Sequence, residues 1–163
     1  MKNKNLSFMT QAAMIAAIYV VLTYIFAPFS FGEVQVRISE ALTILPIFTP
    51  AAIPGLFAGC LIGNILGGAI LPDIVFGSIA TLIGAFFTWK LREQKPVVAT
   101  FPPIISNIII VPFVLRYGYG VTLPIPFMML TVGIGEIVSC GVLGIVLYTA
   151  LNKYRHILFR RKF

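Results

Sequence analysis

Apolar stretches with almost no charge follow one another along the whole chain, separated by short polar breaks. They are continuously apolar and lack the alternation of a strand, which argues against a transmembrane β-barrel. A helix needs about 20 apolar residues to cross a bilayer, and most of the stretches approach that length. The stretches cover residues 8–27, 38–48, 51–71, 74–89, 97–115 and 123–151. This pattern predicts an all-α integral membrane protein, with six transmembrane helices in one bundle and a single domain over residues 1–163.

The second stretch, residues 38–48, is the shortest and the least regular. It is about 11 residues long, so it is either a short helix extended by Arg37–Glu40 or a re-entrant segment. Helix-breaking residues set it apart, because Pro28 follows the first stretch and Thr49–Pro50 precedes the third. The apolar pattern alone therefore leaves two interpretations open at this point.

The distribution of basic residues decides between them. The chain is 59% hydrophobic and 10% charged, whereas typical soluble domains have about 25% charged residues. Ten of its twelve lysines and arginines lie in residues 2–4, 90–95 and 153–162, and they produce most of the net charge of +7. The positive-inside rule puts all three clusters in the cytoplasm, which requires six true spans. We expect a multi-pass cell-membrane protein with both termini cytoplasmic, and we attribute the charge to topology rather than to nucleic-acid binding.

Residues with catalytic chemistry are scarce, so we expect that this protein is not an enzyme. The single histidine, His156, lies in the basic tail, and Cys60 and Cys140 fall inside apolar spans, where they are typical of small packed side chains. The chain has no Gly-x-x-x-x-Gly-Lys-Ser/Thr loop and no His-Glu-x-x-His motif. We predict no metal site and no cofactor in this chain. Uphill transport would then need an ion gradient or another subunit as its energy source.

A charged island at residues 32–41 stands out between the first two apolar stretches. It holds Glu33, Gln35, Arg37 and Glu40, a density of donors and acceptors that a plain connecting loop does not need. Arg37 and Glu40, three residues apart, either contact a polar ligand or form an ion pair with each other. We expect this island to form the rim of a binding pocket that opens outward, together with Asp73 and the loop containing Tyr117.

Glu136 is the most informative single residue, because it lies near the middle of the last span. A carboxylate at the centre of a bilayer costs about 2.5–3.5 kcal/mol on insertion scales. It is either a ligand acceptor or proton site, or a structural group bonded to polar neighbours. Asn64 and Asn107, also inside spans, have the same two interpretations. The candidate substrate-binding residues are Gln35, Arg37, Glu40, Asn64, Asp73, Asn107, Tyr117 and Glu136.

Small residues form two regular series. In the third stretch a glycine recurs every fourth residue from Gly55 to Gly67, which lets another helix approach closely. In the first stretch, alanines at positions 12, 13, 16 and 17 make two overlapping Ala-x-x-x-Ala pairs. Each series indicates either packing within the chain or contact with a partner.

Several motifs resemble the QueT family along essentially the whole chain. They are Val34-Gln-Val-Arg-Ile-Ser-Glu-Ala-Leu-Thr-Ile-Leu-Pro46, Phe48-Thr-Pro-Ala-Ala-Ile-Pro-Gly55, Gly59-Cys-Leu-Ile-Gly-Asn64 and Asp73-Ile-Val-Phe-Gly-Ser78. The resemblance implies a substrate-binding subunit (S component) of an energy-coupling factor (ECF) importer. Such a subunit has six helices and works with a membrane coupling subunit and two ATPases that use ATP.

The resemblance also implies a substrate and a partner surface. The substrate would be a queuosine precursor, a 7-deazaguanine derivative or queuine, and the lipid bilayer would surround the subunit. Ala12, Ala13, Ala16 and Ala17 would form the surface for the coupling subunit. An alternative from another class is a stand-alone proton-coupled carrier that uses Glu136 as its proton site.

Overall fold

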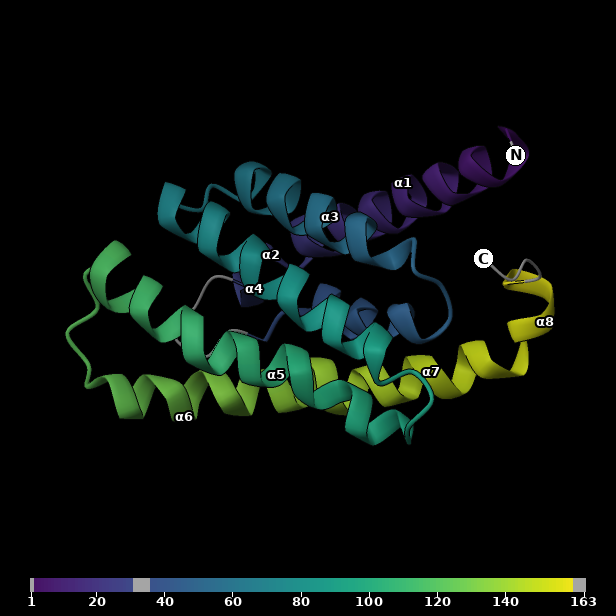
Figure 1. Ribbon diagram of the computed structural model, residues 1–163. Coiled ribbons are helices and arrows are strands. Elements are labelled where there is room, and N and C mark those ends of the chain that lie inside the picture. Colours follow the sequence, from purple (N-terminus) through teal and green to yellow (C-terminus); the bar gives the residue numbers. More distant parts are fainter. Residues whose placement is uncertain (1, 31–35, 160–163) are drawn as a thin grey trace.

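The structure, a computed structural model, describes residues 2–30 and 36–159, and these residues form helices joined by short turns. About 84% of the chain is helical. The elements are α1 (Lys2–Ile25), α2 (Ala27–Ser30), η1 (Ile38–Ile47), α3 (Ala52–Leu66), α4 (Leu71–Lys90), α5 (Pro96–Phe113), η2 (Val114–Gly118), α6 (Ile125–Glu136), η3 (Ile137–Leu143), α7 (Gly144–Lys153) and α8 (Arg155–Leu158). The long helices run along one another as a bundle (Figure 1), which confirms the predicted all-helical class.

Four helical segments are long and apolar enough to cross a membrane. They are Asn3–Ile25, Leu71–Lys90, Pro96–Gly118 and Ile125–Lys153. The other two predicted spans are apolar helices of 10 residues in η1 and 15 residues in α3. Both are shorter than the roughly 20 residues that span a bilayer. Within residues 2–30 and 36–159, all six apolar stretches are therefore helical, and four of them have the length of a full span.

The predicted boundary between the third and fourth stretches is wrong by several residues. α3 ends at Leu66, because Gly68 adopts a φ of +76°, a conformation that favours glycine. α4 begins at Leu71 with Pro72 in its first turn, where a missing N–H costs nothing. Asp73 consequently lies inside the first turn of α4 and not in the preceding turn.

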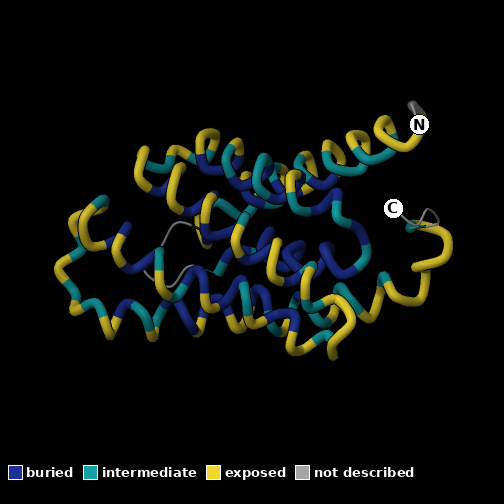
Figure 2. Tube along the Cα trace, in the orientation of Figure 1, coloured by how far each residue is buried: buried dark blue, intermediate teal, exposed yellow. Residues whose placement is uncertain are grey.

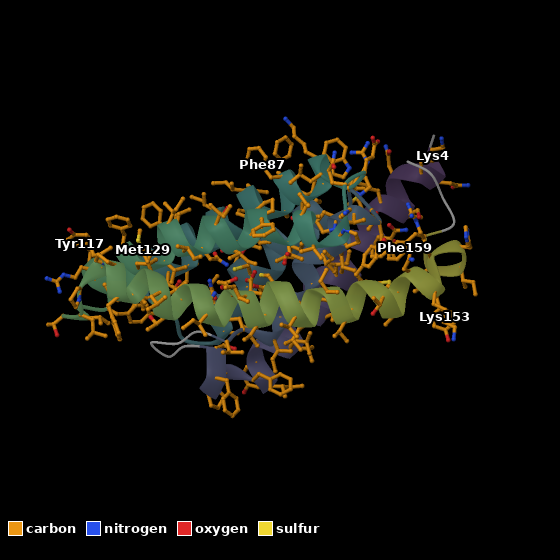
Figure 3. The ribbon with its side chains drawn as sticks, turned by 90° about the horizontal axis from the view of Figure 1, so that it is seen from below. Lys4, Phe87, Tyr117, Met129, Lys153 and Phe159 are labelled. Carbon is orange, nitrogen blue, oxygen red and sulfur yellow. The ribbon has the colours of Figure 1, made fainter. Side chains whose placement is uncertain are left out.

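The two chain ends and the turn between α4 and α5 lie at the same end of the bundle (Figure 1). Lys4 and Lys153 lie at that end and Tyr117 at the opposite one (Figure 3). This arrangement brings the described parts of the three basic clusters to one end of the bundle. The sequence predicts this, because an even number of spans separates the clusters. The side of the membrane that this end faces stays a prediction.

η1 is a short 3₁₀ helix held in the middle of the bundle. Every residue from Ser39 to Ile47 is buried, and Pro46 lies near its end. Buried positions follow the inner faces of the surrounding helices, whereas the outer faces are exposed (Figure 2). Those outer faces carry large apolar side chains such as Phe76, Phe87 and Phe101. Exposed apolar surface of this extent suits lipid contact rather than water.

The glycine series of α3 packs against α1. A Cβ added at Gly55 would lie 2.7 Å from the carbonyl oxygen of Ala12, and one added at Gly59 would lie 2.7 Å from Cβ of Tyr19. Gly63 faces Thr23 in the same way, with a distance of 3.3 Å. At Gly55 and Gly59 these contacts show packing within the chain, because only glycine allows the two helices so close together.

We expect Gly59→Ala to lower the stability of the protein by about 1–3 kcal/mol, because the added methyl group overpacks the α1–α3 contact. Thermal unfolding in detergent measures this change. Gly144→Ala is the matched control: a Cβ there would lie 3.8 Å from its nearest neighbour, an ordinary contact distance. Equal melting temperatures for the two variants would contradict the proposed close packing.

Candidate functional site

η1 carries most of the polar groups that the bundle buries. Arg37 immediately precedes it, and Ser39, Glu40 and Thr43 lie on it; all four side chains are at most 4% exposed. A short 3₁₀ helix surrounded on all sides has no solvent face, so each polar group on it must find a partner inside the protein. The partners divide into two clusters.

The first cluster, the Arg37 network, joins four parts of the chain. The Arg37 guanidinium forms an ion pair with Asp73 of α4, with 3.4 Å between Nη2 and Oδ2. Its Nε donates to the carbonyl oxygen of Ser30 at 3.2 Å, and its Nη1 donates to Oδ1 of Asn64 at 3.4 Å. The Asn64 amide in turn donates to the backbone oxygen of Asp73. The planar guanidinium thus links the end of α1–α2 to α3 and α4.

Tyr119 completes this network from the loop between η2 and α6. Its hydroxyl donates to Oδ2 of Asp73 at 2.9 Å. Burial and the neighbouring Asp73 carboxylate raise the pKa of Tyr119 to about 12. The phenol therefore keeps its proton at neutral pH and remains a donor.

The second cluster, the acid cluster, consists of Glu40, Glu136 and Cys140. One carboxylate oxygen of each glutamate and the Cys140 sulfur lie within 4.8 Å of one another, and all three residues are buried. Tyr19 of α1 donates to Oε1 of Glu40. The Cys140 thiol donates to Oε2 of Glu136 at 3.1 Å. The cluster therefore joins η1 to the helix pair α6–η3, with a hydroxyl from α1.

Amide and hydroxyl groups surround the acid cluster. The Asn107 amide of α5 interacts with the Glu136 carboxylate. The Thr43 hydroxyl donates to the backbone oxygen of Glu40 at 2.6 Å, and its oxygen lies 3.5 Å from the Cys140 sulfur. Within the described residues, three side-chain oxygens are buried without a hydrogen-bond partner: Oε2 of Glu40, Oδ1 of Asp73 in the Arg37 network, and Oγ of Ser139. An unsatisfied buried carboxylate oxygen is costly, so it marks a place where a donor from a ligand would be favourable.

Charge is unbalanced between the two clusters. Arg37 and Asp73 form an ion pair, whereas Glu40 and Glu136 have no lysine or arginine within ion-pair distance among the described residues. Two buried carboxylates close together repel each other unless a proton or a cation lies between them. The acid cluster therefore needs a proton or a cation between its two carboxylates.

Most of the predicted site residues come together, but not as a rim. Arg37, Asn64 and Asp73 share one cluster, and Glu40, Asn107 and Glu136 share the other. Arg37 and Glu40 are core residues, only 4% and 1% exposed. Of the two roles left open for Arg37 and Glu40, the structure does not show a mutual ion pair, because Arg37 pairs with Asp73, which lies far away in the sequence.

Two predicted residues are not in either cluster. Gln35 lies outside the described residues. Tyr117 is 77% exposed and points away from the bundle at its far end (Figure 3). The neighbouring Tyr119 occupies the network instead, because the chain turns after η2 and directs its side chain inward.

Sequence reasoning missed Tyr19 and Cys140. Tyr19 lies in an apolar span with no local sign that it would meet Glu40, which is 21 positions away. The apolar context of Cys140 predicts a small packed side chain, although this residue follows Glu136 by four positions. That spacing places two side chains on the same helix face and was the available signal.

These features define a class: a helical membrane protein that gathers its few buried charges around one short central helix. The sequence model of the QueT transporter family matches residues 9–153, and the chain belongs to this family. A similar protein is the "Queuosine precursor transporter QueT" of Lactococcus lactis subsp. cremoris (strain MG1363), which is 33% identical over 84 residues. The alignment covers 50% of this chain and 48% of that relative, so it spans about half of the relative's length. No solved structure matches the chain.

We expect Tyr119→Phe to lower stability by about 1–3 kcal/mol, because Asp73 loses a donor in a partly buried place. The melting temperature in detergent reports the change. Tyr117→Phe is the matched control, since its hydroxyl lies on a highly exposed side chain two residues away. Identical melting temperatures for both variants would show that the Tyr119–Asp73 hydrogen bond contributes nothing.

Proposed function

We propose that this protein is the substrate-binding membrane subunit of an ATP-driven ECF importer, and that its substrate is a queuosine precursor. Membership of the QueT transporter family supports the transport role. The observation that carries the binding role is the buried Glu40–Glu136 pair, whose unsatisfied oxygen and negative charge call for a donor-rich ligand. Packing alone gives no reason to bring two carboxylates together.

The chemistry of a 7-deazaguanine suits this site. Its guanine-like edge presents adjacent N–H donors, which a carboxylate accepts in bidentate fashion. Its carbonyl oxygen accepts from an amide such as that of Asn107, which lies beside Glu136. In this proposal Glu136 and Asn107 hold the base, and the Arg37 network fixes the position of η1 relative to α3 and α4.

The proposed partner surface is the exposed face of α1. Only 17% of the α1 span is buried, whereas the other three spans are 39–44% buried, so α1 lies at the edge of the bundle. Ala12 and Ala16 face the glycines of α3. Ala13 and Ala17 are exposed on the opposite face. Of the four predicted alanines, these two are available to a membrane coupling subunit; ATP would be used by the two ATPase subunits.

We expect Glu136→Gln to weaken deazaguanine binding at least about tenfold, because loss of a charged acceptor costs about 1.5–3 kcal/mol. Isothermal titration calorimetry on the purified protein measures this. Glu93→Gln, at an 84% exposed carboxylate in the α4–α5 turn, serves as the control. Unchanged affinity in Glu136→Gln would remove Glu136 from the site.

We expect Ala13→Leu and Ala17→Leu to leave ligand binding intact and to abolish ATP-dependent uptake, because the larger side chains block close approach of a partner helix. Ala150→Leu makes the same change at an exposed alanine of α7 and should transport normally. Uptake into proteoliposomes, with and without the ATPase module, is the measurement. Uptake by this chain alone under a pH gradient would instead favour the proton-coupled carrier.

A further inference from the structure

A long apolar groove runs along the outer surface of the bundle between α4 and α5. Its volume is about 640 Å³, and Phe87 and Phe101 line it while remaining about half exposed. Lys90 lies at the end of the groove where α4 ends, and among the described residues it is the one charged side chain of the lining. We propose that this groove binds an acyl chain of an anionic phospholipid whose headgroup contacts Lys90. The proposal does not depend on the transported substrate.

The length of the groove matches one leaflet of a bilayer. Its α5 side extends from Val98 to Ile110, which is about 18 Å at a helical rise of about 1.5 Å per residue. One leaflet contributes about half of a hydrocarbon core that is about 30 Å thick. The groove is thus long enough for the acyl chain of a lipid in one leaflet. A second apolar groove shares Ile109 and Ile110 with the first and continues it toward Tyr117.

The groove arises because α4 and α5 meet closely beneath it. A Cβ added at Gly84 would lie 2.7 Å from Cα of Pro103, so the two backbones almost touch along this line. Ile83 and Ile105, larger side chains on either side of the contact, line the groove above it. Ile105 is 51% exposed, so the rest of the described chain leaves the groove open. An apolar surface of this kind is covered either by lipid or by another apolar helix.

The basic end of the groove lies at the depth of lipid headgroups. Lys90 and Arg92 follow Trp89, which is the only tryptophan of the chain. Tryptophan is enriched where the hydrocarbon core of a membrane meets water. The Arg92 guanidinium lies 4.6 Å from the centroid of the Trp89 ring, and Nζ of Lys90 lies 5.0 Å from the centroid of the Phe86 ring. Both cations therefore stay beside aromatic rings at the outer surface, where a headgroup would be.

The charge of Lys90 favours an anionic lipid over an apolar helix. Within the described residues the ion pairs are Arg37–Asp73 and Arg92–Glu93, so the Lys90 ammonium has no acidic partner. A lysine at a helix end suits this position, because its stem packs on apolar surface and its ammonium stays in the polar region. An anionic headgroup attached to an acyl chain is complementary to both parts. A helix without charge would fill the groove but leave the ammonium unpaired.

Trp89 provides a local reporter, because brominated acyl chains quench the fluorescence of a tryptophan that they contact. The full chain is reconstituted into vesicles of brominated phosphatidylglycerol, which is anionic, brominated phosphatidylcholine, which is zwitterionic, or defined mixtures of each with the unbrominated other lipid. The quenching of Trp89 then gives the relative affinity of the two lipids at this end of the groove. We expect a preference of about fivefold for phosphatidylglycerol, the effect of one basic residue near an anionic membrane.

A matched pair of lysine variants separates the groove from general surface charge. Lys90→Gln should reduce the preference below about twofold, whereas Lys90→Arg should retain it. Lys153→Gln is the control and should also retain it. Lys153 lies at the same end of the bundle (Figure 3) and has its Nζ 5.9 Å from the centroid of the Tyr154 ring, but it does not line the groove. Both glutamine variants lower the net charge of the protein by one.

A second pair of variants tests the seat of the acyl chain without a change in charge. Ile105→Phe places a larger side chain in the groove and should also reduce the preference for phosphatidylglycerol. Ile134→Phe makes the same change at a 53% exposed position of α6, outside the groove, and should have no effect. Loss of the preference in Ile105→Phe alone would show that the lipid chain, and not the headgroup charge by itself, is bound there.

Several results would overturn this inference and leave the proposed function standing. One is an equal affinity of the two lipids for the unmodified protein, which needs no variant. Another is an equal loss of preference in Lys90→Gln and Lys153→Gln, which would indicate general surface charge. An unchanged preference in Ile105→Phe would indicate headgroup attraction without a bound chain. Quenching by both lipids that falls as the protein-to-lipid ratio rises would show that a second copy of the chain covers the groove.

Discussion

The Arg37–Asp73 ion pair is the interaction on which the arrangement of the core depends. It holds the start of η1 against α4, and the same guanidinium bonds Asn64 of α3 and the carbonyl oxygen of Ser30. A charge buried in this way is tolerated only with its partners in place, because removal of one leaves the other unpaired in a medium of low polarity. The ion pair thus fixes the position of a short, fully buried helix. Packing of apolar side chains alone would define that position less well.

Fixing η1 has consequences at both of its ends. Its position brings Glu40 to Tyr19 of α1 and within reach of Glu136 on the last long helix. The close packing of the α3 glycines on α1 sets the position of Tyr19 along the bundle, next to η1. Packing and polar contacts therefore cooperate: small residues bring α1 and α3 together, and the buried polar groups decide how the enclosed helix is oriented.

In a membrane protein that binds a polar ligand, the groups needed for binding lower the stability of the ligand-free fold. Two carboxylates near each other, one of them with an unsatisfied oxygen, destabilise the empty protein. In the proposed function, a ligand that supplies hydrogen-bond donors relieves this cost, so the folded core would be more stable when occupied. The Arg37 network also holds an unsatisfied carboxylate oxygen, Oδ1 of Asp73, but its two charges form an ion pair. In the proposed function, the Arg37 network supports the fold and the acid cluster binds the ligand, and the two share one short helix.

The sequence by itself determined the class, the family and the identity of most buried polar residues. Continuous apolar stretches predict membrane helices, and a carboxylate within one of them is too costly to be accidental. It did not determine which of these residues meet. Arg37 pairs with Asp73 rather than with nearby Glu40, and Tyr119 rather than Tyr117 joins the network. Such pairings depend on the angles at which helices cross and on where each helix begins, and these are set by packing between segments far apart in the sequence.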